Sequence, residues 1–538
     1  MTKRQTWILT VISAAALILG LLISGRIWFR LDLTKNKAYT ISPVSRSLAA
    51  EIPDQVRITY YVSDKLSSIH PMPGEIEDLL REYAAYSRGK IRFSRRDPAK
   101  LEMVQAVEQM GIQPRQIQSV ERDEATFSTV YTGIVIEYRE QAEVLPWVFS
   151  LDTLEYDLSS RIRSMIRESS REVGVLVGDA DKQWAQDYGY LDQVFTQSGY
   201  RVRLLSPGEE IPDGLPVLLV LGGVEELDEW ALYRIDRYIQ TGGKALFALE
   251  GVFVNAKGSL ESRVKTDGGL LAMVASYGAA VRPEMVLDRS ALTLQYQTAS
   301  PSGSIQFRII RYPHWIGVLA ENGNAGHPIT SGFAGIDLFW ASPLMLNPPA
   351  QVQGEVLFST TPDAWRMTRD FSANPDMSYL FEMEEGDTRG TQILAAALSG
   401  KFPGWFRDKP KPVREGSEEE LPDLPGEPRD SRIVVVGDSD FATTLIQMTG
   451  GQGAQNLDFM LKAADWLGND DDIIGIRNRQ SQAGRLDRII DPEKRLSAMR
   501  FSQVLNVGIL PLAFVAVGIL RGLRRRTKTK GREFSDGV

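Results

Sequence analysis

The sequence has 538 residues but no cysteine, and it contains only three histidines. Without cysteine the chain has no disulfide, no thiolate metal ligand and no cysteine nucleophile. A chain free of thiols also suits an oxidising compartment. His70, His314 and His327 are too few for a histidine-rich metal centre or a relay of bases. We therefore predict neither a bound metal nor a thiol-based activity.

The usual signatures of nucleotide and nucleic-acid binding are also missing. The sequence has no G-x-x-x-x-G-K-[ST] loop, and its Gly-Gly pairs at 222–223 and 242–243 form no G-x-G-x-x-G fingerprint. Acidic residues outnumber basic ones by 69 to 61, so the net charge of −8 offers no basic footprint for nucleic acid. We predict no cofactor and no nucleic-acid partner, so any ATP hydrolysis must belong to another protein.

Two long uncharged stretches, 7–25 and 501–520, predict membrane spans. At about 1.5 Å per residue, each covers a hydrocarbon layer of about 30 Å as a helix. The arginine-rich end at 521–538 follows the second stretch, and positive residues beside a span stay cytoplasmic. We therefore expect a two-pass protein of the cell (inner) membrane, in contact with lipid. Both termini would be cytoplasmic and the bulk extracytoplasmic.

Between these stretches the pattern of strands and helices predicts two α/β domains. Residues 31–170 alternate strands and helices in an order compatible with a thioredoxin-like fold. Residues 171–470 contain near-continuous apolar strands separated by helices, which is typical of a doubly wound parallel sheet. In this second domain we place an insertion at about 290–400 and a disordered, acidic, proline-rich loop at 408–430. The other predicted segments are an N-terminal anchor at 1–30, a juxtamembrane segment at 471–500, a transmembrane helix at 501–520 and a basic tail at 521–538.

Two of the predicted strands end in the same Gly-Asp-x-Asp pattern, at 178–181 and at 437–440. Parallel strands share one carboxyl edge, so these turns are expected to lie together, where such sheets bind ligands. The aspartates fit three roles: capping a helix or closing a turn, binding Mg²⁺, Ca²⁺ or sugar hydroxyls, or catalysis. The candidate ligand-binding residues are Asp179, Asp181, Asp438, Ser439 and Asp440.

The second turn, “GDSDF”, is similar to the G-x-S-x-G elbow of serine hydrolases. Phe441 stands where the elbow has its second glycine, and its side chain would crowd the turn. A serine nucleophile also needs a base, and only His314 or His327 could supply one. We therefore predict no catalytic residue. The alternatives kept open are a membrane-anchored extracytoplasmic serine hydrolase that uses Ser439 and a structural envelope scaffold.

Several stretches resemble the auxiliary proteins of ABC-type transport systems, of the GldG (gliding-motility) type. The more specific stretches are “DLTKNKAYTISP” at 32–43 and “GDSDF” at 437–441. The resemblance implies an extracytoplasmic domain with a class I glutamine-amidotransferase-like fold, paired with an ABC permease and a cytoplasmic ATPase. That likeness concerns fold alone, because the amidotransferase chemistry uses a cysteine. Members often show Gly-His-Gly-Glu where this chain has Gly178-Asp179-Ala180-Asp181. We accordingly expect a non-enzymatic binding or coupling subunit of such a system.

Overall fold

The structure is a computed structural model that describes residues 40–468 and Ile476, apart from eight short gaps. These residues belong to the first of two compact units, Met1–Gln480. Among them, no helix has both the length and the apolar character needed to cross a membrane. The stretches 7–25 and 501–520 lie outside the described residues. The gaps are 101–102, 122–123, 152, 168–170, 300–304, 384–388, 414–419 and 450–452.

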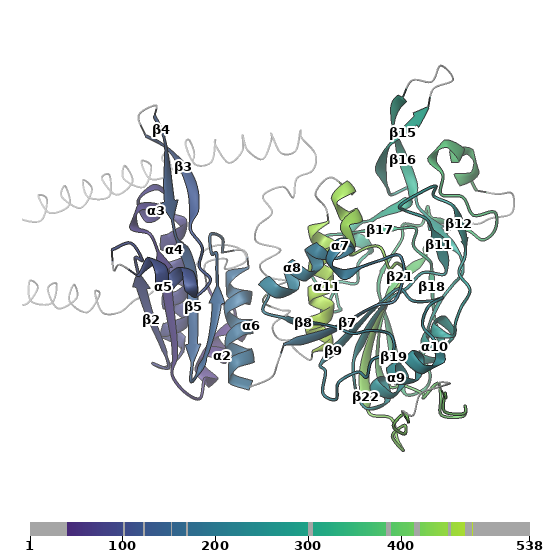
Figure 1. Cartoon of the computed structure of the whole chain (residues 1–538), viewed down its shortest axis with the longest axis horizontal. Helices are drawn as coiled ribbons and strands as arrows, with labels where there is room; N and C mark the ends of the chain where they lie inside the picture. The colour runs from purple at the N-terminus through teal and green to yellow at the C-terminus, as the bar shows by residue number, and fades with distance from the viewer. Residues whose placement is uncertain are drawn as a thin grey trace, which may run out of the picture. The chain divides into compact units, whose positions relative to one another are not determined.

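A four-stranded mixed sheet, in the order β2-β1-β5-β6, organises the first part of the chain (Figure 1). β1 pairs in parallel with β2 and antiparallel with β5, and β5 pairs antiparallel with β6. Ile76, Leu80 and Tyr83 lie on one face of α4 and are buried in its core. The elements are α2 (Pro43–Glu51), β1 (Val56–Val62), α3 (Asp64–Ile69), α4 (Met72–Tyr86), β2 (Ile91–Arg96), α5 (Val104–Gln109), the hairpin β3 (Arg115–Glu121) and β4 (Glu124–Val130), β5 (Thr132–Tyr138), β6 (Gln141–Leu145) and α6 (Leu154–Arg167).

A nine-stranded sheet forms the centre of the larger, following part. Five of its strands run parallel, in the order β8-β7-β9-β10-β22. Next to β22 lies β21, which is antiparallel to it and pairs in turn with β18 and β19; β13 follows at the edge. The strands are β7 (Glu172–Val177), β8 (Arg201–Leu204), β9 (Val217–Leu221), β10 (Ala245–Ala248), β13 (Ala279–Val281), β18 (Leu344–Leu346), β19 (Val352–Ser359), β21 (Ile393–Lys401) and β22 (Asp430–Val436).

Helices cover both faces of this sheet, and smaller sheets extend one side. The helices are α7 (Trp184–Asp187), α8 (Gly189–Gln197), α9 (Glu229–Gln240), α10 (Leu270–Tyr277) and α11 (Ala454–Leu467), with 3-10 turns at Ala320–Asn322, Pro375–Phe381 and Thr444–Thr449. The smaller sheets pair β11 (Val252–Val254) with β12 (Ser262–Val264), β14 (Met285–Leu287) with β20 (Trp365–Met367), and β15 (Ala291–Ala299) with β16 (Ile305–Val318) and β17 (Ile336–Phe339).

The continuous apolar strands divide their side chains between two cores. In β9, Leu219 packs on the side of α8 and α11, whereas Leu218 and Val220 pack on the side of α9 and α10. Successive side chains of a strand point to opposite faces, so a strand that is covered on both faces must be apolar throughout. α9 begins at a sequence-encoded cap, because the Asp228 side chain accepts a hydrogen bond from the Ala231 N–H at 2.9 Å.

The predicted fold class, a two-span protein with a doubly wound parallel sheet, is therefore wrong. The structure shows a sheet-rich α/β body whose main sheet is mixed. β21 runs antiparallel along the whole of β22, from Ala395–Val436 to Lys401–Asp430. The apolar run of β21, “ILAAALSGK”, fits a buried strand of either direction, so periodicity alone gave no sign of the reversal. The class is corrected to a mixed α/β body, with no membrane-crossing helix among the described residues.

A buried ion pair links α11 to the chain just before β7. Asp465 on α11 is fully buried, and the Arg171 guanidinium forms an ion pair with it. Tyr156 on α6 and Tyr200 donate hydrogen bonds to the same carboxylate at 2.5 and 2.6 Å. Arg171 also donates to the Ser198 carbonyl at 3.0 Å and to the Tyr156 hydroxyl at 3.1 Å, but Asp465 carries the negative charge, so its removal leaves a buried cation without a counter-ion.

Replacing Asp465 with asparagine tests this link. We expect Asp465→Asn to lower the free energy of unfolding by about 3 kcal/mol, because Arg171 stays buried without its counter-charge. Asp213→Asn is the control, since Asp213 is 92% exposed and 3.9 Å from its partner Arg237; it should change nothing measurable. Urea unfolding of both variants, followed by tryptophan fluorescence, makes the comparison. Equal midpoints for the two variants would show that the buried pair is dispensable.

Candidate functional site

The first predicted aspartate lies at the point where the order of the parallel strands reverses. β8 lies on one side of β7 and β9 on the other, so the crevice between β7 and β9 is the switch point where α/β sheets bind ligands. Asp179 follows β7, and Gly223 follows β9. The Gly223 N–H donates a hydrogen bond to Oδ1 of Asp179 at 2.8 Å. Asp179 therefore bridges the two strands across the crevice.

This bridge depends on glycines that let the two turns touch. A Cβ on Gly178 would lie 2.4 Å from Cα of Gly223, closer than carbon atoms can approach. A Cβ on Gly222 would lie 2.2 Å from the carboxyl carbon of Asp179, and Gly222 also has a φ of +71° that disfavours other residues. The glycine that ends each strand thus makes room for the buried carboxylate.

Two lysines hold the Asp179 carboxylate from opposite sides. The Nζ of Lys182 lies 3.1 Å from Oδ2, and the Nζ of Lys265, which follows β12, lies 3.3 Å from Oδ1. Lys265 also pairs with Glu250, which follows β10. The lysine side chains are only 10% and 4% exposed. Two ammonium groups therefore occupy the space between the carboxylates.

The second Gly-Asp-x-Asp turn completes the same group. Lys182 Nζ lies 2.7 Å from Oδ1 of Asp440 and donates to Oγ of Ser439 at 2.8 Å. The Ser439 hydroxyl donates to Asp179 at 3.3 Å, and its N–H donates to Glu250 at 2.7 Å. We call this group the strand-end ion cluster: Asp179, Lys182, Glu250, Lys265, Ser439 and Asp440.

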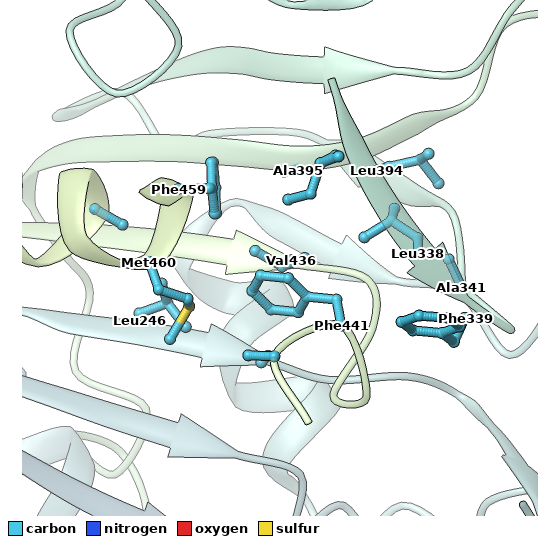
Figure 2. Packing of buried hydrophobic residues seen from close by; sticks show 14 of the residues in the cluster. Leu246, Leu338, Phe339, Ala341, Leu394, Ala395, Val436, Phe441, Phe459 and Met460 are labelled. Carbon is cyan, nitrogen blue, oxygen red and sulfur yellow. The ribbon is translucent and has the colours of Figure 1, made fainter. Parts of the chain in front are cut away.

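Asp438 accepts hydrogen bonds from the backbone and fixes the turn. Its two carboxylate oxygens accept hydrogen bonds from the N–H groups of Asp440 and Phe339, each at 2.6 Å. Phe441 then enters the core, where Figure 2 shows it among Leu246, Val436 and Met460. Asp438 therefore serves the turn, which is the capping role the sequence allowed for.

Asp181 does not join the cluster either. Its side chain is exposed, and its backbone carbonyl accepts a hydrogen bond from Lys257 at 2.7 Å. Of the five candidate residues, the structure brings together Asp179, Ser439 and Asp440.

Sequence reasoning missed the lysines and Glu250. Lys182 stands directly after the first Gly-Asp-x-Asp pattern, so its spacing from Asp179 was a usable signal. Glu250 follows the apolar run of β10 and was a second signal of the same kind. Nothing in the sequence marks Lys265, which lies outside the main sheet's strands and reaches the site only through the β11–β12 hairpin.

A sequence comparison bears on this site. The profile of the family described as “ABC-type uncharacterized transport system” matches residues 170–463, which span the main sheet and every residue of the ion cluster. The chain belongs to this family. Residues 35–137 match a separate domain of unknown function. The family match supports an auxiliary role in transport for this chain.

Other similarities to this transport-family chain are more distant. A protein of Borreliella burgdorferi is 23% identical over 507 residues, which cover 93% of this chain and 94% of that protein. The mmIFT52 N-terminal domain has a TM-score of 0.30 at 12% identity, covering 55% of this chain and 96% of its own. A ThuA-like protein from Parabacteroides merdae has a TM-score of 0.26 at 12% identity, covering 56% and 91%.

In this transport-family protein Asp179 and Lys182 are held in their charged forms. Burial opposes ionisation of Asp179, but the two lysines and the Gly223 N–H lower its pKa to about 2. Burial likewise disfavours the charge on Lys182, yet the carboxylates around it, Asp440 foremost, hold its pKa well above the ordinary value. The pKa of Asp440 is raised by burial, which Lys182 only partly offsets. Lys182 therefore stays protonated at neutral pH.

These charges leave Ser439 without a base. Ser439 is fully buried, and a lysine base must lose its proton, which the raised pKa of Lys182 prevents. Burial lowers the pKa of His314 to about 3, but its ring packs against Tyr312 and Phe381 rather than Ser439. The ring of His327 packs against Trp466. The hydroxyl of Ser439 thus acts as a hydrogen-bond link between Lys182 and Asp179.

A cavity of about 250 Å³ opens beside the cluster. Asp179, Lys182, Glu250 and Asp440 line its inner wall, and Phe253 and Trp340 add aromatic surface. Among the described residues, no group of three or more acidic or histidine side chains is placed to hold a metal ion. The lysines already supply the positive charge that neighbouring carboxylates would otherwise take from a cation.

The pKa of Asp179 predicts how stability depends on pH. It is about 2 in the folded protein against an ordinary 3.8, so the unfolded chain binds more protons between about pH 4 and pH 2. The ionised carboxylate therefore stabilises the fold above about pH 4, and that contribution, about 2 kcal/mol, is lost as the pH falls to 2. Urea unfolding should show the gap between wild type and Asp179→Asn shrinking by this amount over that range. The exposed neighbour variant, Asp181→Asn, should show a smaller change, and a gap for Asp179→Asn that stays constant with pH would contradict the ion cluster.

Proposed function

We propose that the protein is a non-enzymatic binding or coupling subunit of a GldG-type ABC transport system. The observation that carries this proposal is the strand-end ion cluster, which lies inside the segment matched by the transport family. The cluster occupies the place where α/β enzymes keep their reactive groups. Here the same place holds paired charges and a buried serine, which suits binding and shape change better than chemistry.

The cluster is suited to coupling because it joins segments that are distant in sequence. Asp179 follows β7, Glu250 follows β10, Lys265 follows β12 and Ser439 follows β22. A ligand or partner loop that entered the neighbouring cavity would compete for Lys182 or Asp440 and shift several strand ends at once. Such a contact would transmit a signal without a bond being made or broken.

An ABC permease and a cytoplasmic ATPase are the partners in this proposal. The chain has no phosphate-binding loop of its own, so the energy of transport must come from another subunit. The family match supports association with transporter components in general. The stretch “DLTKNKAYTISP” at 32–43 supports the GldG type in particular.

Co-purification tests the partnership. We expect the tagged full chain, extracted in mild detergent from its native cells, to retain a multispan permease and a Walker-motif ATPase. An untagged copy of the same chain, expressed in excess, serves as competitor and should reduce the recovery of both partners. Recovery of the chain alone, or with envelope proteins unaffected by the competitor, would favour the structural scaffold instead.

We also propose that the bulk of the chain is extracytoplasmic. The complete absence of cysteine supports an oxidising location. Because the chain has no native thiol, a single cysteine introduced at an exposed position such as Tyr190, which is 42% exposed, reports its own side of the membrane. We expect a membrane-impermeant maleimide to label Tyr190→Cys in intact spheroplasts. Labelling only after lysis would place the domain in the cytoplasm.

A further inference from the structure

The β15–β16 hairpin exposes an apolar face. Figure 1 shows the two strands extending from the sheet-rich part of the chain. Ile305, Phe307 and Ile309 lie at alternate positions of β16, and they are 69%, 66% and 69% exposed. Alternate residues of a strand share one side, so the three side chains form a single row. We call this row the hairpin apolar face.

The other side of β16 carries the exposed polar residues Gln306 and Arg308 beside the apolar row, and it is partly buried from Ile310 onward. Ile310 and Tyr296 pack against the main core, and Leu294 is only 7% exposed. Opposite the apolar row on β15 lie Gln295 and Gln297, which pair with Ile309 and Phe307 and are themselves exposed. The apolar side chains of the hairpin are thus exposed on one side of β16 only, and such an exposed apolar row is typical of an interaction surface.

The charge of the hairpin indicates the chemistry of the surface that its apolar row contacts. Residues 289–318 contain three arginines and no aspartate or glutamate, although the whole chain carries a net charge of −8. Arg311 is exposed and follows Ile309 on the same side of the strand, where its guanidinium donates to the Arg289 carbonyl at 3.5 Å. A locally positive segment on an acidic protein complements an anionic surface.

The spacing along β16 matches the layers of a bilayer interface. At about 3.4 Å per residue, the row from Ile305 to Ile309 covers about 14 Å, and Arg311 lies about 7 Å beyond it. Apolar and aromatic side chains of interfacial segments enter the boundary of the acyl chains, while arginines stay at the level of the phosphates. Along β16 the hairpin presents these two layers in that order from Ile305 to Arg311.

We propose that the β15–β16 hairpin binds an anionic lipid bilayer, with Ile305, Phe307 and Ile309 in the interface and Arg311 at the phosphates. A protein partner would also cover apolar side chains, but the acid-free hairpin and the arginine behind the apolar row favour lipid. The contact is independent of the transport role, because it uses neither the ion cluster nor its cavity.

The absence of native cysteine makes a local test possible. The full chain carrying Phe307→Cys is labelled with an environment-sensitive fluorophore and incubated with vesicles of phosphatidylcholine and 30% phosphatidylglycerol. Gln306→Cys is the matched control, since it lies one residue away on the opposite side of the strand. We expect a blue shift and quenching by doxyl-labelled lipid at position 307, at least twofold stronger than at position 306. Adding Arg311→Gln to Phe307→Cys should weaken this response about fivefold, and phosphatidylcholine alone should weaken it further.

Three results would overturn the proposal. Equal quenching at 306 and 307 would show adsorption without insertion of the apolar row. A response at position 307 that is unchanged by leaving out phosphatidylglycerol and by Arg311→Gln would show that electrostatic attraction does not contribute to binding. A label at 307 that shifts only when the permease is present would assign the face to a protein partner. Loss of permease and ATPase in co-purification, with lipid quenching retained, would refute the transport proposal and leave this one intact.

Discussion

The structure around the switch point depends on one buried carboxylate held between two lysines. Asp179 has lost nearly all contact with water, and burial of an isolated charge of this kind would cost several kcal/mol. Lys182 and Lys265 offset that cost, and each lysine in turn needs a further carboxylate, Asp440 or Glu250. The ends of β7, β10 and β22 and the β11–β12 hairpin are therefore fixed relative to one another by alternating charge. The glycines at 178 and 222 are required because only their small size lets the carboxylate reach the neighbouring backbone.

The same arrangement leaves Ser439 without the base that a serine nucleophile needs. A nucleophilic serine needs a neighbour that can accept a proton, and a lysine can do so only when its pKa is depressed. Lys182 is surrounded by carboxylates, so its pKa is raised instead. The 2.8 Å contact between Lys182 and Ser439 is thus a hydrogen bond within a structural network. This electrostatic state agrees with an auxiliary role in transport.

Particular residues show what sequence reasoning could reach and what it could not. The repeated Gly-Asp-x-Asp pattern predicted a shared edge, and Asp179, Ser439 and Asp440 do meet there, although their use as a ligand site remains a prediction. Asp181 fails to join them because strand-end patterns fix a position along the chain but not the direction of a side chain.

Lys265 could not be found from the sequence, since the fold of a hairpin far from the pattern brings it in. The antiparallel direction of β21 could not be predicted from the sequence for a similar reason. A buried strand is apolar throughout whichever way it runs, so partners and orientation are decided by tertiary packing. The alternating apolar residues of β16 are visible in the sequence, but a sequence does not tell which side of a strand is exposed. Only the structure shows that Ile305, Phe307 and Ile309 lie in water.

The order in which strands enter the main sheet has a consequence for biosynthesis. β10 ends at Ala248, but its neighbour β22 begins only at Asp430, after about a third of the chain has intervened. Until that late segment emerges, one edge of β10 presents unpaired backbone groups that invite pairing with other chains. A nascent chain of this protein therefore has to be kept from premature association during about a third of its synthesis, and a truncated product lacking β22 would be a substrate for chaperones or proteases.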